Sequence, residues 1–282
     1  MIETKFLKQL DKFSLVIKKR VTSSYLGQRR SIAGGRGILF RDHRIYAPGD
    51  DIRAIDWKVY ARTDDLYIKN YEEERNATVH VIVDQSGSMN FGKQVKKFEY
   101  AAQLGIGFAY LATQENEKLQ FSTFAESLKI FQPKRGMGHL MTMVDHLNKI
   151  KAQGHSRMNE ALMQYKKAIA SKSIIILISD FLISQEEITE VLYRISNHDV
   201  KVIQVLDPVE KALKFQGDFK LKDAESGTKQ KVHISQRTRQ QYMNQMEQHT
   251  LKIEATCGKL GMQFFSLTSD TPVFDAFYQL LS

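Results

Sequence analysis

The strongest constraint in this sequence is a regular alternation, from residue 79 onward, of short apolar runs and longer segments with helical spacing. The apolar runs, rich in β-branched residues, lie at 79–83, 119–124, 128–131, 174–178, 200–206 and 263–267. Helical spacing covers about 94–115, 137–150, 159–170, 185–197 and 236–257, and one more helix closes the chain. Strands that are apolar at almost every position are buried on both faces, as in a parallel sheet covered by helices. Residues 77–282 are therefore predicted to form an α/β domain with a doubly wound, mostly parallel sheet of Rossmann-like architecture.

Two further segments precede this domain, and one interrupts it. Apolar residues spaced three and four apart over 3–20 predict an amphipathic helix with a lysine-rich opposite face, within a basic segment that covers 1–30. Residues 31–76 are first glycine-rich and then alternate in hydropathy, which predicts a small β-rich module. Residues 211–234 break the alternation of strands and helices, and a small hairpin insertion around 226–228 is expected there.

The net charge of +9 belongs to the amino end of the chain. Residues 1–46 contain eleven Lys and Arg against three acidic residues, whereas 47–76 contain five against eight. Such a segment suggests a nucleic-acid or anionic-surface binder, which stays open as an alternative function. It carries no array of stacking aromatic residues and no recognition motif, so nucleic acid is not the partner that we expect.

Cysteine content and hydropathy bear on the compartment. Cys257 is the only cysteine, which excludes an internal disulfide and is typical of a reducing compartment; we expect it to be a small packing residue. The first thirty residues lack the apolar stretch of a signal peptide, and the longest apolar run, 174–178, is too short to cross a bilayer. We expect a cytoplasmic protein without a membrane segment.

Polar side chains follow two of the predicted strands. Asp84, Ser86 and Ser88 come directly after the first, and Asp180 follows the run of isoleucines further along the chain. In an open α/β sheet, ligands bind beyond the carboxyl ends of the strands, so we expect these oxygens at one edge. Ser156, in the loop before a predicted helix, offers a further hydroxyl, and Mg²⁺ prefers oxygen ligands. Ordinary turn and helix-capping roles are the alternative for the serine loop taken alone.

The same loop also matches the spacing of a phosphate-binding P-loop. Gly87, Gly92 and Lys93 stand at positions of that motif, between a predicted strand and a predicted helix. The next residue is Gln94, where a P-loop has the Ser or Thr hydroxyl that binds Mg²⁺. Despite this mismatch, a nucleotide-binding protein that uses Gly87 to Lys93 is kept as the alternative to a metal site.

The order Asp84-Gln85-Ser86-Gly87-Ser88, then Ser156, then Asp180, resembles the metal-ion-dependent adhesion site of von Willebrand factor A (vWA) domains. The resemblance implies a vWA fold for 77–282. It also implies that Ser86, Ser88 and Ser156 bind Mg²⁺ or Mn²⁺, and that Asp84 and Asp180 help directly or through water. Ser156 stands where the family usually has threonine, so the hydroxyl is kept and a methyl group is lost.

A longer block upstream carries a more specific resemblance. It comprises Arg44-Ile45-Tyr46-Ala47-Pro48-Gly49-Asp50-Asp51, Arg53, Ile55-Asp56-Trp57, Ala61-Arg62 and Glu72-Glu73-Glu74. This block, together with Leu206-Asp207-Pro208, is similar to the prokaryotic family called domain of unknown function 58. Members of that family carry the block just before a vWA-like domain and are commonly encoded beside MoxR-type AAA+ ATPases. The resemblance therefore implies a MoxR-type ATPase as partner.

Within this block, Trp57 and Tyr60 are expected to anchor the core. Asp50, Asp51 and Asp56 are expected to be turn or cap residues, or partners of nearby arginines, with an acidic patch for a partner as the other interpretation.

The chemistry of the predicted metal site favours binding. A cation held mostly by neutral hydroxyls keeps much of its charge and attracts a carboxylate from outside the chain. No general base with suitable reach is evident in the sequence, so we expect no enzymatic activity. The expected function is that of a Mg²⁺-dependent protein-binding adaptor whose partner offers an acidic residue.

Overall fold

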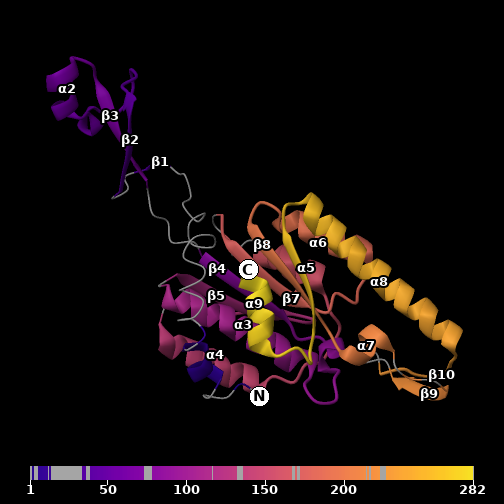
Figure 1. The fold of residues 1–282 in the computed structure, drawn as a ribbon. Helices are drawn as coiled ribbons and strands as arrows, with labels where there is room; N and C mark the ends of the chain where they lie inside the picture. The colour runs from indigo at the N-terminus through magenta and orange to yellow at the C-terminus, as the bar shows by residue number, and fades with distance from the viewer. Residues whose placement is uncertain are drawn as a thin grey trace. The chain divides into compact units, whose positions relative to one another are not determined.

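We describe the chain from a computed structural model (Figure 1). It describes residues 2–281 apart from 3–5, 12, 14–33, 36–38, 73–77, 116, 132–135, 167–168, 170–171, 214, 216 and 223–226. The chain divides into two compact units, which are described separately. The main unit comprises Met1–Arg20 and Ala77–Ser282, and the small unit comprises Val21–Asn76.

A six-stranded sheet forms the centre of the main unit. Its strands are β4 (Thr78–Asp84), β5 (Lys118–Phe124), β6 (Leu128–Ile130), β7 (Ile174–Ser179), β8 (Asp199–Leu206) and β11 (Gln263–Thr268). They lie in the order β11-β8-β7-β4-β5-β6, and every neighbouring pair is parallel except β5 and β6. The predicted doubly wound, mostly parallel sheet is confirmed.

Helices cover both faces of this sheet. They are α3 (Lys97–Gln114), α4 (Met137–Lys149), α5 (Met158–Lys166), α6 (Gln185–Ile195), α8 (Gln236–Lys259) and α9 (Val273–Leu281). Figure 1 shows α3, α4 and α9 on one face and α5, α6 and α8 on the other, in agreement with their mutual contacts. Ile82 packs in the core beside α5, α6 and α8, whereas the next residue, Val83, lies against Gly105 of α3. This is why the strands are apolar at successive positions.

The order of the strands fixes where a ligand site is expected. From β4 the chain first crosses to β5 and β6, and later returns to the other side of β4 to build β7, β8 and β11. The carboxyl ends of β4 and β7 therefore flank the point where the winding direction reverses. In open α/β sheets this switch point is the usual position of a ligand. Asp84 ends β4 there, and Ser179 ends β7.

Other elements of the main unit are a helical stretch near the amino end, the short helix α7 and a hairpin. Described residues 6–11 and 13 near the amino end are helical, and Phe13 packs against Phe274 and Phe277 of α9. The rest of the predicted amino-terminal helix, with Lys5, Lys12, Lys18 and Lys19, lies outside the described residues. The short helix α7 (Pro208–Ala212) precedes the antiparallel pair β9 (Gly217–Lys222) and β10 (Lys229–Ile234). This hairpin was expected here, although most of its turn, 223–226, lies outside the described residues.

The small unit contains an antiparallel sheet in the order β1-β3-β2. Its elements are β1 (Gly34–Gly35), β2 (Leu39–Ile45), the 3₁₀ turn η1 (Ile52–Ala54), α2 (Trp57–Thr63) and β3 (Tyr67–Glu72). Arg44 donates two hydrogen bonds of 2.6 Å to the carboxylate of Asp50. Asp51 and Asp56 accept from the backbone N–H groups that begin η1 and α2. The predicted turn, cap and arginine-partner roles of these aspartates are confirmed.

The prediction for Trp57 and Tyr60 is wrong. Trp57 is 57% exposed and Tyr60 is 38% exposed, and their rings meet edge to face with centroids 6.0 Å apart. The reason is that α2 has only seven residues, none of them buried. Among the residues of this unit whose burial the structure describes, the buried apolar ones are Ile55 and Ile68, which pair across a β-bridge.

Across the described ranges, no helix is both long enough and apolar enough to span a membrane.

The contact between α3 and α9 gives a stability prediction. Gly107 of α3 faces Phe277 so closely that an added Cβ would lie 2.0 Å from the ring Cζ atom. Because a packed core resists extra atoms, Gly107→Ala should lower the free energy of unfolding by about 1 to 3 kcal/mol. Gly138→Ala in α4 is the matched control, since its Cβ would meet nothing within 4 Å. The control should raise that free energy by about 0.5 to 1 kcal/mol. Urea unfolding measures both, and equal effects would contradict the packing described.

Candidate functional site

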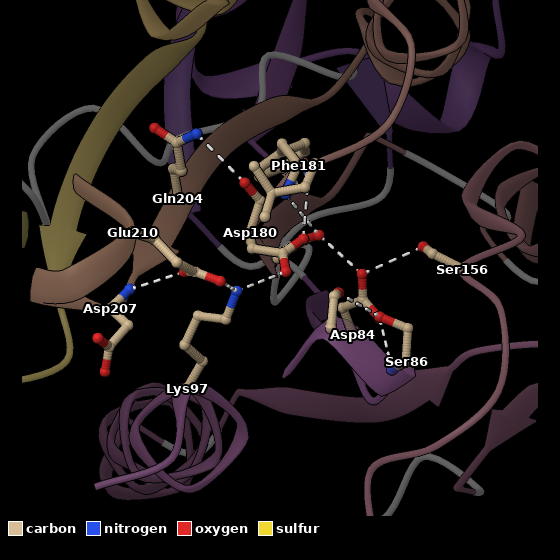
Figure 2. A network of polar contacts seen from close by, with 12 residues as sticks. Asp84, Ser86, Lys97, Ser156, Asp180, Phe181, Gln204, Asp207 and Glu210 are labelled. Atoms are coloured by element: carbon tan, nitrogen blue, oxygen red, sulfur yellow. Dashed lines mark hydrogen bonds and ion pairs between the residues drawn. The ribbon is translucent and has the colours of Figure 1, made fainter. Parts of the chain in front are cut away.

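Asp84 lies at the centre of the candidate site, at the end of β4, and its side chain has no exposed surface. Its Oδ1 atom accepts a hydrogen bond of 2.8 Å from the backbone N–H of Ser86. Its Oδ2 atom accepts from the hydroxyls of Ser179, at 2.7 Å, and Ser156, at 3.2 Å. Three separate segments of the chain thus meet at one carboxylate, as Figure 2 shows for Ser86 and Ser156.

Ser86 and Ser88 belong to the tight turn that follows β4. The turn continues into the 3₁₀ helix η2 (Gly87–Asn90), and the two hydroxyl oxygens lie 3.1 Å apart. The loop that carries Ser156 is tied to this turn by its backbone. The N–H of Gly87 donates to the carbonyl of Gly154 at 2.8 Å. The structure therefore brings Ser86, Ser88 and Ser156 together around Asp84.

Asp180 lies beside this group but is turned toward another partner. Its Oδ2 atom accepts a hydrogen bond of 2.9 Å from the ammonium group of Lys97. The same ammonium group donates at 2.7 Å to Glu210, and Figure 2 shows it between the two carboxylates. The Lys97 side chain is fully buried. Asp180, the last of the predicted site residues, therefore belongs to a buried ion triad with Lys97 and Glu210.

The triad extends to the start of α7. While one oxygen of Glu210 accepts from Lys97, the other accepts from the backbone N–H of Asp207 at 3.0 Å. Asp207 in turn caps α7 by accepting from Val209, which completes a capping box. Glu210 therefore links the candidate site to the helix that precedes the hairpin.

Burial shifts the pKa values of the charged groups in opposite senses. Burial and then the negative charge of Asp180 raise the pKa of Asp84 well above its ordinary value. Burial also raises the pKa of Glu210, although the charge of Lys97 lowers it. For Lys97, burial lowers the pKa, but the charges of Asp180 and Glu210 outweigh it and the pKa is raised. Lys97 is therefore charged. A cation near Asp84 would favour the ionised form of the Asp84 carboxyl group.

Sequence reasoning missed Lys97, Ser179 and Glu210. Lys97 begins a helix whose residues three and four positions on, Tyr100 and Ala101, are buried, so helical spacing places it on the apolar face. Ser179 is the single polar residue of β7, which is otherwise apolar. Both signals were available in the sequence. No such signal was available for Glu210, because its contact with Lys97 joins residues 113 positions apart in the sequence.

Two of the predicted ligands have the spacing that Mg²⁺ coordination requires. The ion prefers octahedral oxygen ligands at about 2.0 to 2.1 Å, which places neighbouring ligand oxygens about 3 Å apart. The separation of 3.1 Å between the Ser86 and Ser88 hydroxyls fits two such positions. Among the described residues, no cluster of three or more His, Cys, Asp and Glu side chains is arranged to hold a metal. The predicted set instead uses serine hydroxyls, and its role as a metal site stays a prediction.

The alternative P-loop lacks the geometry that phosphate binding needs. In a P-loop, the helix begins at the glycine and lysine, so that its first N–H groups face the phosphate. Here α3 begins at Lys97, four residues after Lys93, and Lys93 is exposed. Gly87 starts a 3₁₀ turn whose N–H is already bonded to Gly154. The loop is thus occupied by contacts of the candidate metal site.

A family model described as "Protein of unknown function DUF58" matches residues 42–252. This stretch covers most of the small unit's described elements and the strands that carry the site. The chain belongs to the DUF58 family. The description of this family assigns no activity to its members.

Three bacterial proteins whose names assign no function are similar to this DUF58 chain. The chain is 25% identical over 273 residues to the uncharacterized protein Rv1480 of Mycobacterium tuberculosis (strain ATCC 25618 / H37Rv), which covers 95% of this chain and 86% of that protein. The uncharacterized protein Mb1516 of Mycobacterium bovis is similar to the same extent. The uncharacterized protein YeaD of Bacillus subtilis (strain 168) is 25% identical over 104 residues, or 37% of this chain and 24% of that protein.

Two solved structures of bacterial proteins are each similar to about 72% of this chain. The conserved hypothetical protein BatB from Bacteroides thetaiotaomicron is 13% identical with a TM-score of 0.44, over 72% of this chain and 96% of that one. The vWF domain of the type V pili tip protein Mfa5 from Porphyromonas gingivalis is 11% identical with a TM-score of 0.38, over 72% of this chain and 94% of that one.

The ion triad gives a prediction about stability. Removing the ammonium group in Lys97→Met leaves Asp180 and Glu210 buried without their cation. The free energy of unfolding should fall by about 3 to 5 kcal/mol, as expected when one partner of a buried ion pair is lost. The matched control is Lys96→Met, because Lys96 is exposed and its ammonium group donates to the side chain of the exposed Asn90. The control should change the free energy by less than about 0.5 kcal/mol in the same denaturant titration. Similar losses in both variants would contradict a buried triad.

Proposed function

We propose that this DUF58 protein is a Mg²⁺-dependent protein-binding module that uses a metal-ion-dependent adhesion site. The observation that carries the proposal is that the Ser86 N–H and the Ser156 hydroxyl both bond the buried carboxylate of Asp84, while the Ser88 hydroxyl lies 3.1 Å from that of Ser86. These three serines would hold the cation, with Asp84 and Asp180 binding directly or through water. The ion would supply a positively charged coordination position that a ligand from outside can enter.

The charges around the site favour a carboxylate as that ligand. Asp180 already has Lys97 as its cationic partner. Asp84 is thus the one member of the predicted set that offers an uncompensated negative charge to a divalent ion. The bound ion would keep part of its charge, and an acidic side chain of a partner protein would complete the balance.

The same contacts favour binding over catalysis. Both carboxylate oxygens of Asp84 accept hydrogen bonds, from Ser86 on one side and from Ser156 and Ser179 on the other. A general base needs a free oxygen within reach of a substrate proton. Asp84 is better arranged to orient the serines than to take up a proton from a substrate.

The partner follows from the family resemblance. We propose that the protein works as an adaptor for a MoxR-type AAA+ ATPase, in the cytoplasm, and helps it to assemble or remodel client proteins. The bound cation would recognise an acidic residue of the ATPase or of the client.

Metal binding is the first test. Calorimetry with Mg²⁺ and Mn²⁺ should detect a single site, and Ser86→Ala with Ser88→Ala should weaken binding at least about tenfold because two ligands are lost. Ser196→Ala is the matched control, since that hydroxyl bonds the carbonyl of Tyr193 on α6. Equal affinity in both variants would refute the metal site. Tight binding of an ATP analogue that is lost in Lys93→Ala would instead support the P-loop alternative.

Partner capture is the second test. Pull-down with the MoxR-type ATPase from the same organism should succeed with Mg²⁺ and fail with a chelator. Asp84→Ala should abolish capture, because the serines lose the acceptor that orients them. Circular dichroism of the variant checks that the sheet is intact. If Asp84→Ala leaves both metal binding and capture unchanged, the site has no role in recognition.

A further inference from the structure

A cavity of about 710 Å³ lies beside the candidate metal site, near the ends of β5, β6 and α4. Its lining includes three lysines, Lys129, Lys149 and Lys151. Lys129 is on β6, Lys149 is the last residue of α4, and Lys151 follows that helix. The volume is within the range of pockets that bind small ligands or a few residues of a peptide.

The cavity and the candidate metal site share the same two loops. Gln85 lines the cavity, and the next residue, Ser86, is a predicted metal ligand. Gly154 lines the cavity two residues before Ser156. The N–H of Gln153 donates to the carbonyl of Gln85 at 3.0 Å, which holds the two loops together. A molecule bound at the metal would therefore lie next to the cavity.

The lining of the cavity is positively charged. Among the described residues that line it, Glu126 is the single acidic one, against the three lysines. Within the described part of the chain, none of these lysines forms an ion pair. Their field reaches His146, whose pKa is lowered first by burial and then by the charges of Lys129 and Lys149. The cavity therefore has uncompensated positive charge to offer to an anionic ligand.

We propose that this cavity binds further acidic side chains of the same partner segment whose carboxylate binds the cation at Ser86, Ser88 and Ser156. The inference rests on the proposed function and names the chemistry of the partner, which is an extended segment with several acidic residues. In an extended chain, side chains two residues apart lie on one side at about 7 Å spacing. One carboxylate can then bind the metal while the next enters the lysine-lined cavity.

The test uses two synthetic peptides, labelled for fluorescence anisotropy. One hexapeptide alternates aspartate and glycine, and the other keeps a single aspartate with glycine elsewhere. With Mg²⁺ present, the three-aspartate peptide should bind at least about tenfold more tightly than the single-aspartate peptide, and the difference should shrink as salt is added.

Charge reversal assigns this difference to the cavity. Lys149→Glu with Lys151→Glu should remove it, because both lysines face the second carboxylate. Lys252→Glu with Lys259→Glu is the matched control, since it makes the same change in net charge at exposed positions of α8. Thermal unfolding verifies that both variants fold, and the control should bind both peptides as the unchanged protein does.

The outcomes separate this inference from the proposed function. If both peptides bind equally, require Mg²⁺ and ignore the lysine reversal, the cavity is not part of the recognition surface and the proposed function stands. If neither peptide binds better with Mg²⁺ than with a chelator, the proposed function fails. If inorganic phosphate binds in a lysine-dependent way while neither peptide does, the cavity selects a small anion and the peptide assignment is overturned.

Discussion

The arrangement of the site depends on one requirement, which is that a fully buried carboxylate at the end of a central strand must be hydrogen-bonded. An unpaired buried carboxylate is costly because it loses its hydration without compensation. Asp84 meets this requirement with donors from the turn after β4, from the end of β7 and from the loop before α5. Each of these segments is irregular or ends a strand, and their common acceptor adds to the backbone hydrogen bonds of Gly87 and Gln153 that tie the two loops together. The Ser156 hydroxyl thus helps to satisfy the buried carboxylate of Asp84.

The strands of the sheet could be predicted from the sequence because the apolar pattern that each strand needs lies within that strand. A strand between two helical layers must be apolar at successive positions, and β4 and β7 have that signature. The expected edge of polar residues followed from topology alone, and Asp84, Ser86, Ser88 and Ser156 are close to one another. Boundaries were less accurate. The predicted helix from residue 94 begins at Lys97, because the N–H of Lys97 bonds the carbonyl of Phe91 and the chain loops before the helix starts.

The partners of the missed residue Lys97 depend on contacts between distant segments. The interaction of Lys97 with Asp180 joins residues 83 positions apart, and no local pattern specifies which buried lysine meets which carboxylate. The misplaced Trp57 has a different cause. Large aromatic residues favour cores in general, but a seven-residue helix in a small three-stranded unit leaves its side chains exposed. In both cases a residue-type preference was correct on average and was overridden by the size or the connectivity of this particular fold.

The use of serine hydroxyls around Asp84 has a consequence for how this site can change state. A carboxylate only accepts hydrogen bonds, whereas a hydroxyl both donates and accepts. In the structure, the Ser156 hydroxyl donates to Asp84. If an ion binds here as proposed, rotation about a single C–O bond would let the same oxygen direct a lone pair at it. Binding and release of the proposed ion would then require rotation of a hydroxyl group in place of movement of the backbone.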